Sequence, residues 1–206
     1  MKRVKVYIDG FNLYHAIDRI GDLRLKWISY RTLAQSFLRP DEQLSGVTMF
    51  TAIWTFDQAK QFRHKNFIAA QRHYGVTVIE GSFVKPDKYC SSHERYCPFR
   101  EEKQTDVGIA IEIAKDVLTG AVDRVILITA DSDQIPTAKL VHSIPGVDIT
   151  LYAPPNRMQE ARELGKLIPD RNEISVGRLL TCKLPRDIID SEGRTVATCP
   201  AIYGLF

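Results

Sequence analysis

Four aspartates stand at positions where they could share a divalent cation. Asp9 follows a short β-branched and aromatic run, and Asp131 and Asp133 follow the apolar run Arg124–Thr129. Asp106 begins a stretch whose apolar residues have helical spacing. Crowded carboxylates repel one another, and a cation removes that repulsion. Oxygen ligands suit Mg²⁺ or Mn²⁺, which lower the pKa of a bound water and stabilise the charge on a phosphodiester. The pattern therefore indicates metal-dependent hydrolysis without a covalent nucleophile.

Each of these aspartates also has an ordinary structural interpretation. Asp9 suits a turn, and Asp131 and Asp133 suit helix caps, where Asp is favoured. Asp106 suits the N-terminal end of a helix dipole. Taken singly, each aspartate is better explained as structural. Because the four stand together at two strand ends and one helix start, we favour the cluster.

Strand-like and helix-like patterns alternate along the chain and must position these aspartates. Strands are expected at Val4–Ile8, Val47–Thr55, Val76–Ile79, Arg124–Thr129 and Val147–Tyr152. Helices are expected at Tyr30–Leu38, Asp57–Tyr74, Asp106–Leu118, Ile135–Val141 and Asn156–Ile168. Strands separated by helices imply an α/β fold with a parallel sheet. Ligand sites in such sheets form at the carboxyl ends of the strands, where the strand order reverses. If the two strands are neighbours, Asp9, Asp131 and Asp133 meet at one edge and would bind the cation, while Asp106 would complete the cluster or hold a second metal.

The 206 residues and the net charge of +3 fit one mildly basic globular domain. We expect a domain over residues 1–170, with an irregular insertion at about 85–104, and a C-terminal extension over 171–206 that packs on it. No apolar run is long enough for a membrane span, and the first residues do not resemble a signal peptide. A cytoplasmic location without membrane contact is therefore expected. A homo-oligomer is left open.

Three short motifs occur in order along the chain. They are YIDGFNLY at residues 7–14, EKQTDV at 102–107 and ITADSDQIP at 128–136. Together they resemble the motifs of the NYN family, PIN-like proteins related to bacterial LabA-type and eukaryotic limkain-type domains. The resemblance covers roughly residues 3–168. It implies a PIN-like Rossmannoid three-layer sandwich with a mostly parallel central sheet, a divalent metal and ribonuclease activity. Ala130 and Gln134 depart from the family, which commonly has Gly and an aromatic residue there.

The resemblance places Asp9, Asp106, Asp131 and Asp133 at the acidic, catalytic and metal-binding positions. We expect metal-dependent endonucleolytic cleavage of RNA. One alternative is a non-catalytic PIN-like domain that binds RNA or acts as a scaffold. A second is a small-molecule phosphohydrolase of haloacid-dehalogenase type, which usually needs Asp-x-Asp at the first strand end. Phe11 stands where the second of those aspartates would be. Whether the nucleic acid is RNA or DNA is not determined by these motifs alone.

Five residues are candidates for substrate binding. Asn12 either orients a ligand or caps the following helix, and Ser132 either bonds a carboxylate or faces solvent. Lys103, close to Asp106, is a candidate to hold a phosphate. Lys60 and Arg63 begin a run of basic residues without acidic ones, which extends to His73. Such a face on a helix could follow a phosphate backbone or could simply be solvated. A second basic surface is expected from Arg157, Arg162, Lys166 and Arg171.

The insertion holds a Cys-x2-His-x3-Cys pattern formed by Cys90, His93 and Cys97. A closed structural zinc site has four ligands, so Cys182 or Cys199 would have to supply the fourth. We favour a loop without zinc here.

Overall fold

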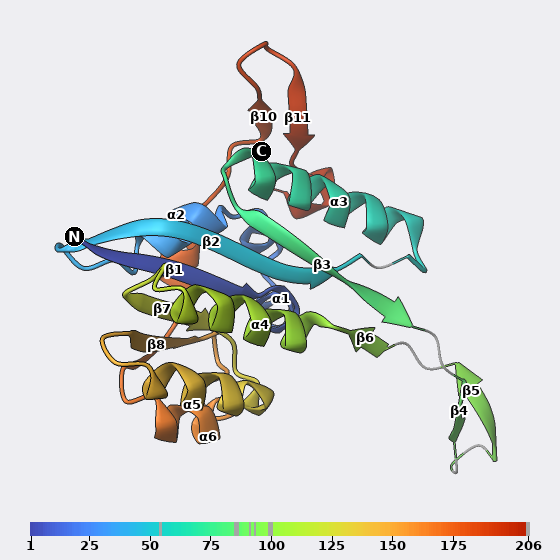
Figure 1. Cartoon of the computed structure of the whole chain (residues 1–206). Coiled ribbons are helices and arrows are strands. Elements are labelled where there is room, and N and C mark those ends of the chain that lie inside the picture. The colour runs from blue at the N-terminus through green and yellow to red at the C-terminus, as the bar shows by residue number, and fades with distance from the viewer. Residues whose placement is uncertain (54, 85–86, 91, 93, 99–100, 205–206) are drawn as a thin grey trace.

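The computed structural model describes residues 1–53, 55–84, 87–90, 92, 94–98 and 101–204 (Figure 1). A twisted sheet of seven strands runs through its centre. Six strands are parallel and lie in the order β3 (Thr77–Val84), β2 (Glu42–Ala52), β1 (Lys2–Asp9), β7 (Arg124–Ile128), β8 (Asp148–Ala153) and β9 (Arg171–Glu173). The antiparallel β6 (Glu101–Lys103) borders β3 at one edge.

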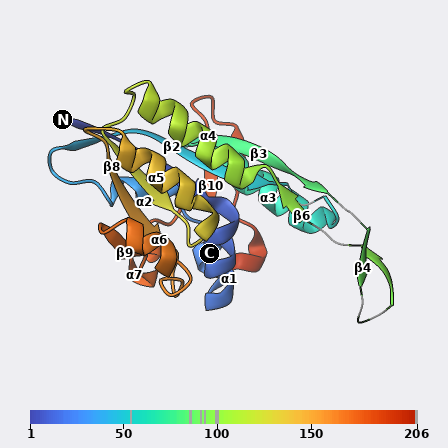
Figure 2. The same ribbon diagram turned by 60° about the horizontal axis from the view of Figure 1, so that its bottom comes forward.

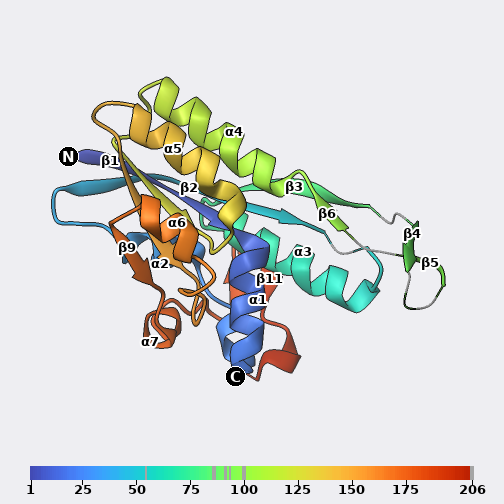
Figure 3. The same cartoon turned by 90° about the horizontal axis from the view of Figure 1, so that it is seen from below.

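Helices cover both faces of this sheet and give three layers. One face carries α1 (Gly10–Ile20), α2 (Tyr30–Gln35), α3 (Gln58–His73) and α7 (Val176–Leu180). The other carries α4 (Thr105–Leu118), α5 (Ile135–Ser143) and α6 (Arg162–Leu167). Figure 3 shows α4 and α5 side by side over the strands. Because the central strands β1 and β7 are covered on both faces, their apolar residues form nearly continuous runs. The expected α/β three-layer sandwich with a mostly parallel sheet is confirmed.

The strand order reverses between β1 and β7. From β1 the chain builds β2 and β3 on one side and later returns to build β7, β8 and β9 on the other. Ile8 pairs with Ile128, so the two strands end at the same level. This is the switch point at which ligand sites form in open α/β sheets. It brings Asp9 beside the turn that follows β7.

The structure corrects two expectations about secondary structure. The expected helix at Asn156–Ile168 begins only at Arg162, because Asn156 has a φ of 59°, which no α-helical residue adopts. The segment 85–104, expected to be irregular, contains β4 (Asp87–Cys90), β5 (Arg95–Pro98) and β6. The first two pair as an antiparallel hairpin that projects from the body (Figures 1 and 2).

Residues after α7 form a second hairpin, of β10 (Asp187–Ile189) and β11 (Thr195–Thr198), followed by a 3₁₀ helix at Ala201–Tyr203. The hairpin packs against α3, where Ala197 and Ile188 join Trp27 and Ala70 in a small apolar cluster. Within the described ranges, no helix has both the length and the apolar character that a membrane crossing needs.

Candidate active site

Three carboxylates meet beyond the carboxyl ends of β1 and β7. One oxygen from each of Asp106, Asp131 and Asp133 lies within 4.8 Å of the other two. Asp106 stands in the first turn of α4, and the other two belong to the turn and 3₁₀ helix after β7. Oxygens on opposite sides of a Mg²⁺ lie roughly 4.2 Å apart, twice the usual bond length. The separation and the exposure of these oxygens thus fit one hydrated divalent cation.

Asp9 lies behind this cluster and is 5% exposed. Its carboxylate accepts hydrogen bonds from the backbone N–H of Asn12 at 3.0 Å and from the Thr129 hydroxyl at 2.9 Å. The first of these bonds makes Asp9 the N-cap of α1. Gly10 allows the helix to start this close to β2, because a Cβ there would lie 2.5 Å from the backbone oxygen of Phe50. The capping role and the place beside the cluster thus coexist in one residue.

The electrostatics of the site favour a bound cation. The pKa of Asp9 is raised to about 6, chiefly by burial and in addition by Asp106 and Asp131, while the two hydrogen bonds oppose the shift. The pKa of Asp106 is raised by partial burial and by Asp131 and Asp133, while a bond from Gln134 opposes the shift. Within the described residues, none of the four aspartates has a lysine or arginine partner. A divalent cation would supply the missing positive charge.

Two buried polar residues support the carboxylates, and the sequence alone did not assign them this role. The Thr129 hydroxyl, which donates to Asp9, also accepts from the backbone N–H of Asp131 at 3.1 Å. Gln134 donates to the backbone oxygen of Asp106 at 3.1 Å and accepts from Thr137 at 2.9 Å. Thr129 directly precedes the acidic turn, which is the only sequence signal for it. Thr129 thus links the end of β1 to the turn after β7, and Gln134 links that turn to α4.

The five expected substrate-binding residues do not gather at one place. Asn12 accepts from the backbone N–H of Ala130 at 3.1 Å and so ties α1 to the acidic turn. Ser132 is exposed in that turn, and Lys103 is exposed on β6. Lys60 and Arg63 lie on α3 and line a cavity of about 540 Å³ that begins at Gly10 and Phe11. The two α3 cations therefore belong to the cavity, on the α1 side of the sheet, and outside the carboxylate cluster.

The domain model for the NYN domain matches residues 3–166, which is most of the chain. This protein belongs to the NYN domain family. NYN domains form part of the PIN-like nuclease superfamily, and the expected family is thereby confirmed. Ala130 donates its backbone N–H to the side chain of Asn12, and Gln134 donates to the backbone oxygen of Asp106 in α4.

Two known proteins are similar to this NYN domain. The 6-hydroxy-3-succinoylpyridine 3-monooxygenase HspA of Pseudomonas putida is 24% identical over 90% of this chain and 71% of its own length. A crystal structure of a protein of unknown function from Vibrio parahaemolyticus superposes with a TM-score of 0.57 at 15% identity. That match covers 85% of this chain and 94% of the other. At this identity the second likeness shows the shared fold.

The zinc pattern falls largely outside the described residues of the NYN domain. His93 is not described, and neither is the side chain of Cys97. Cys90 is a half-buried thiol on β4, and Cys182 and Cys199 are buried thiols. Cys182 packs in the apolar core on the sheet face that carries α1, α2, α3 and α7, and Cys199 packs with the cluster beside α3.

Proposed function

We propose that this protein is a Mg²⁺- or Mn²⁺-dependent endoribonuclease that hydrolyses phosphodiester bonds of RNA with water as the nucleophile. The observation that carries the proposal is the meeting of Asp106, Asp131 and Asp133, with oxygens within 4.8 Å of one another, at the switch point of a NYN domain. Carboxylates without cationic partners are the donor set that hard divalent cations prefer.

The proposed roles follow from the position of each aspartate. Asp106, Asp131 and Asp133 would hold the cation, directly or through water, because their oxygens are accessible and close together. Asp9 would complete the cluster from behind, where its bonds to Asn12 and Thr129 keep its carboxylate facing the others. A bound divalent cation supplies Lewis acidity, which lowers the pKa of a coordinated water and offsets charge on the phosphate.

Other groups of the chain would position the RNA. Ser132 and Lys103 are exposed near the acidic turn and near the start of α4, where a phosphate would have to approach. Lys103 stands two residues before the first residue of α4, whose N-terminal end favours anions. The Lys103 ammonium group would offset the repulsion between the phosphate and the four carboxylates, and the Ser132 hydroxyl would donate a hydrogen bond to a phosphate oxygen.

A cleavage assay tests the proposal directly. Purified protein is incubated with 5′-labelled RNA in Mg²⁺, in Mn²⁺ and in chelator. We expect cleavage with either metal, none in chelator, and products with 5′-phosphate and 3′-hydroxyl ends, because water rather than the RNA 2′-hydroxyl attacks. Products with 2′,3′-cyclic phosphate would contradict the mechanism. RNA binding without cleavage would favour the non-catalytic alternative.

The name of the Pseudomonas relative supports a second candidate, oxygenation of a small heteroaromatic acid. The cavity beside α1 has a suitable size, about 540 Å³, and is lined by aromatic and cationic side chains. We place this candidate second because such a reaction does not require the acidic cluster. Incubation with 6-hydroxy-3-succinoylpyridine, dioxygen and a reduced nicotinamide, followed by chromatography, tests it. A hydroxylated product that forms equally in chelator would support this candidate.

A further inference from the structure

A cavity opens directly beside the first acidic residue, on the α1 side of the sheet. Its wall begins with Gly10 and Phe11, the two residues that follow Asp9. Segments far apart in sequence surround it, including α1, the 3₁₀ helix Leu23–Lys26, α3 and Tyr203 near the C-terminus. Its volume of about 540 Å³ is typical of sites for small organic ligands. The cavity is therefore large enough for one nucleotide.

Aromatic rings form much of its wall. The Phe11 ring is central, with centroids 5.5 Å from Phe83, 6.1 Å from His15 and 6.4 Å from His64. Tyr14 stands edge-on to His15 at 5.5 Å. Offset and edge-to-face rings at these separations make a surface on which a planar ring can stack. Burial lowers the pKa of both histidines, so their imidazoles are neutral near pH 7 and can donate and accept hydrogen bonds.

Two cations stand at the cavity wall on α3. Within the described residues, neither Lys60 nor Arg63 forms an ion pair, whereas Lys26 of the same wall contacts Asp18. The carboxylate of Asp57, the N-cap of α3, accepts a hydrogen bond from the backbone N–H of Lys60. The side-chain ammonium group of Lys60 is not used in this bond. Stacking rings next to unpaired cations are the combination that binds a nucleobase and its phosphate.

We propose that this cavity receives one unstacked nucleotide of the RNA strand, with its base against Phe11 and its phosphate toward Lys60 and Arg63. The proposal rests on the proposed function, since it takes the strand that is cut to be the strand that enters. The base would anchor the strand so that a neighbouring phosphodiester lies over Asp106, Asp131 and Asp133. A free heteroaromatic acid has the same chemistry, a planar ring with an anionic group, and the test separates the two sources.

The test combines an abasic scan of the RNA with a cavity variant. Binding of a fluorescein-labelled 12-nucleotide RNA is followed by anisotropy in Ca²⁺, with a single abasic ribose moved along the strand. We expect one position at which base removal weakens binding roughly 5- to 100-fold, as loss of one stacked base does. Phe11→Leu should weaken the binding of intact RNA by a similar factor. In this variant, removing the base at the sensitive RNA position should have no further effect on binding. The matched control Phe62→Leu, at a ring on α3 that is 71% exposed and outside this cavity, should behave as wild type.

The charge contribution is tested by salt dependence. Arg63→Gln should weaken RNA binding and lower the slope of log Kd against log salt by about one, as loss of one phosphate contact does. Arg186→Gln, at an exposed arginine elsewhere, should leave the slope unchanged. If neither Phe11→Leu nor Arg63→Gln alters RNA binding, or if no abasic position matters, the proposal is wrong.

A cleavage assay and a calorimetric titration distinguish a failure of the cavity proposal from a failure of the proposed function. Cleavage of the same RNA in Mg²⁺ with no abasic position effect would overturn the cavity proposal and leave the proposed function standing. A position effect without any cleavage would overturn the proposed function and support the binding role of the cavity. The calorimetric titration uses 6-hydroxy-3-succinoylpyridine as the free heteroaromatic acid. Binding that Phe11→Leu abolishes, while RNA binding stays unchanged, would assign the cavity to a free acid and overturn the proposal.

Discussion

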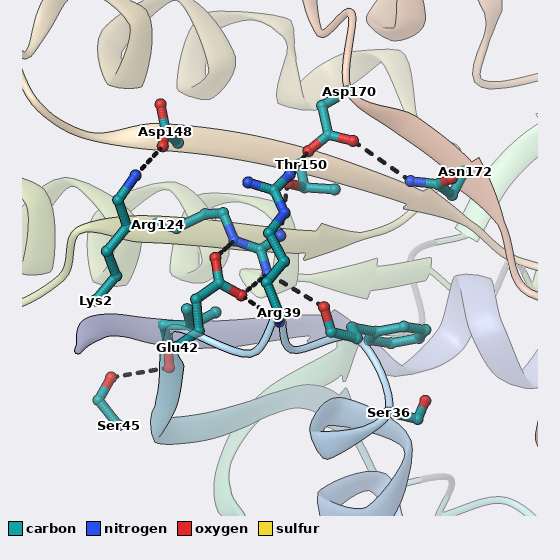
Figure 4. Close-up of polar contacts among 12 residues, drawn as sticks. Lys2, Ser36, Arg39, Glu42, Ser45, Arg124, Asp148, Thr150, Asp170 and Asn172 are labelled. Carbon is teal, nitrogen blue, oxygen red and sulfur yellow. Dashed lines mark hydrogen bonds and ion pairs between the residues drawn. The ribbon is translucent and has the colours of Figure 1, made fainter.

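Buried charges are paired at the amino ends of the parallel strands, whereas the carboxylates at their carboxyl ends have no basic partner among the described residues. At the amino edge, the buried Arg124 forms two bonds with Glu42, at 2.8 and 2.6 Å, and one with Thr150 at 2.8 Å (Figure 4). Asp170 extends this network by accepting from Thr150 and from Arg39. At the carboxyl edge, Asp106, Asp131 and Asp133 bring oxygens within 4.8 Å of one another, and Asp9 is buried next to them. Within the described residues, none of the four has a lysine or arginine partner.

This difference separates structural charges from charges that await a ligand. The side chains of Glu42 and Arg124 are at most 1% exposed, and such a pair persists only because each partner satisfies the other. At the carboxyl edge, burial raises the pKa of both Asp9 and Asp106, and repulsion from the neighbouring carboxylates adds to the rise. An external cation would relieve this repulsion. Four experiments break or sharpen this comparison.

Removing the Arg124 guanidinium group from the amino edge of the sheet should have the largest effect on stability. Arg124→Met leaves Glu42 buried without its partner and should lower the free energy of unfolding by about 3–5 kcal/mol. Urea denaturation followed by circular dichroism measures this. The double variant Glu42→Gln/Arg124→Met should recover a large part of the loss, because no unpaired charge then remains. Equal urea midpoints for Arg124→Met and wild type would show that the pair is not required. If Arg124→Met does not fold, the double variant still provides the test.

Removing charge from the unpaired edge should instead act on catalysis. Asp131→Asn keeps the shape of the side chain and removes charge that would hold the cation, so we expect kcat/KM for RNA cleavage to fall by about 10²–10³-fold or more. RNA affinity in Ca²⁺ should change little. Asp148→Asn, at an exposed ion pair of the amino edge, is the matched control and should cleave at the wild-type rate. Full activity of Asp131→Asn in Mg²⁺ would remove the basis of the proposed mechanism.

The two edges should also respond oppositely to pH in the absence of metal. Because the pKa of Asp9 is raised to about 6, folding stability in chelator should fall as pH rises from about 4 to 6. Asp9→Asn has no carboxylate to ionise, so its stability should not fall over this pH range for that reason. Its free energy of unfolding should therefore rise relative to that of wild type, by at most about 3 kcal/mol. Thermal melts in chelator at pH 4 and pH 7.5 measure it.

Asp123, which accepts hydrogen bonds from Arg3, should give stability a pH dependence of the opposite sign. That contact lowers the pKa of Asp123 to about 2, so its stabilising contribution is present above about pH 4 and lost as the pH falls toward 2. Asp123→Asn should therefore destabilise at neutral pH and approach wild type in acid. An Asp9→Asn variant that melts below wild type at pH 7.5 in chelator would mean that the carboxylate is needed by the fold itself.

The smallest effect is expected where charges are paired but exposed. The Lys2–Asp148 contact spans 3.1 Å between side chains that are each at least half exposed. Solvent screens such pairs, so Asp148→Asn should change the unfolding free energy by at most about 1 kcal/mol. Urea denaturation on the same scale as Arg124→Met checks it. A loss comparable to that of Arg124→Met would show that pairing alone, and not burial, decides the value of these contacts.

Much of the fold could be predicted from local pattern. The strand Arg124–Thr129 differs from β7 by one residue, and the helix Asp106–Leu118 differs from α4 by one. Apolar periodicity locates such segments because burial on fixed faces imposes it. The expectations were poorer where local signals conflict, as at Asn156, and where strands form by edge pairing, as in β6. The helix α1 was anticipated only as an unbounded helix after Asn12, because its start overlaps the acidic motif.

By itself, the sequence determined which acids stand at strand ends and to which family the chain belongs. Those features depend on residues that are neighbours in the chain, so motif and periodicity carry them. Only the tertiary structure decided that Asp9 lies behind the cluster and that Lys60 and Arg63 face a cavity instead of the carboxylates. It also brought Tyr203 to the cavity beside Tyr14. These relations join segments separated by scores of residues, and they follow from strand order and from which sheet face each helix covers, which no local pattern encodes.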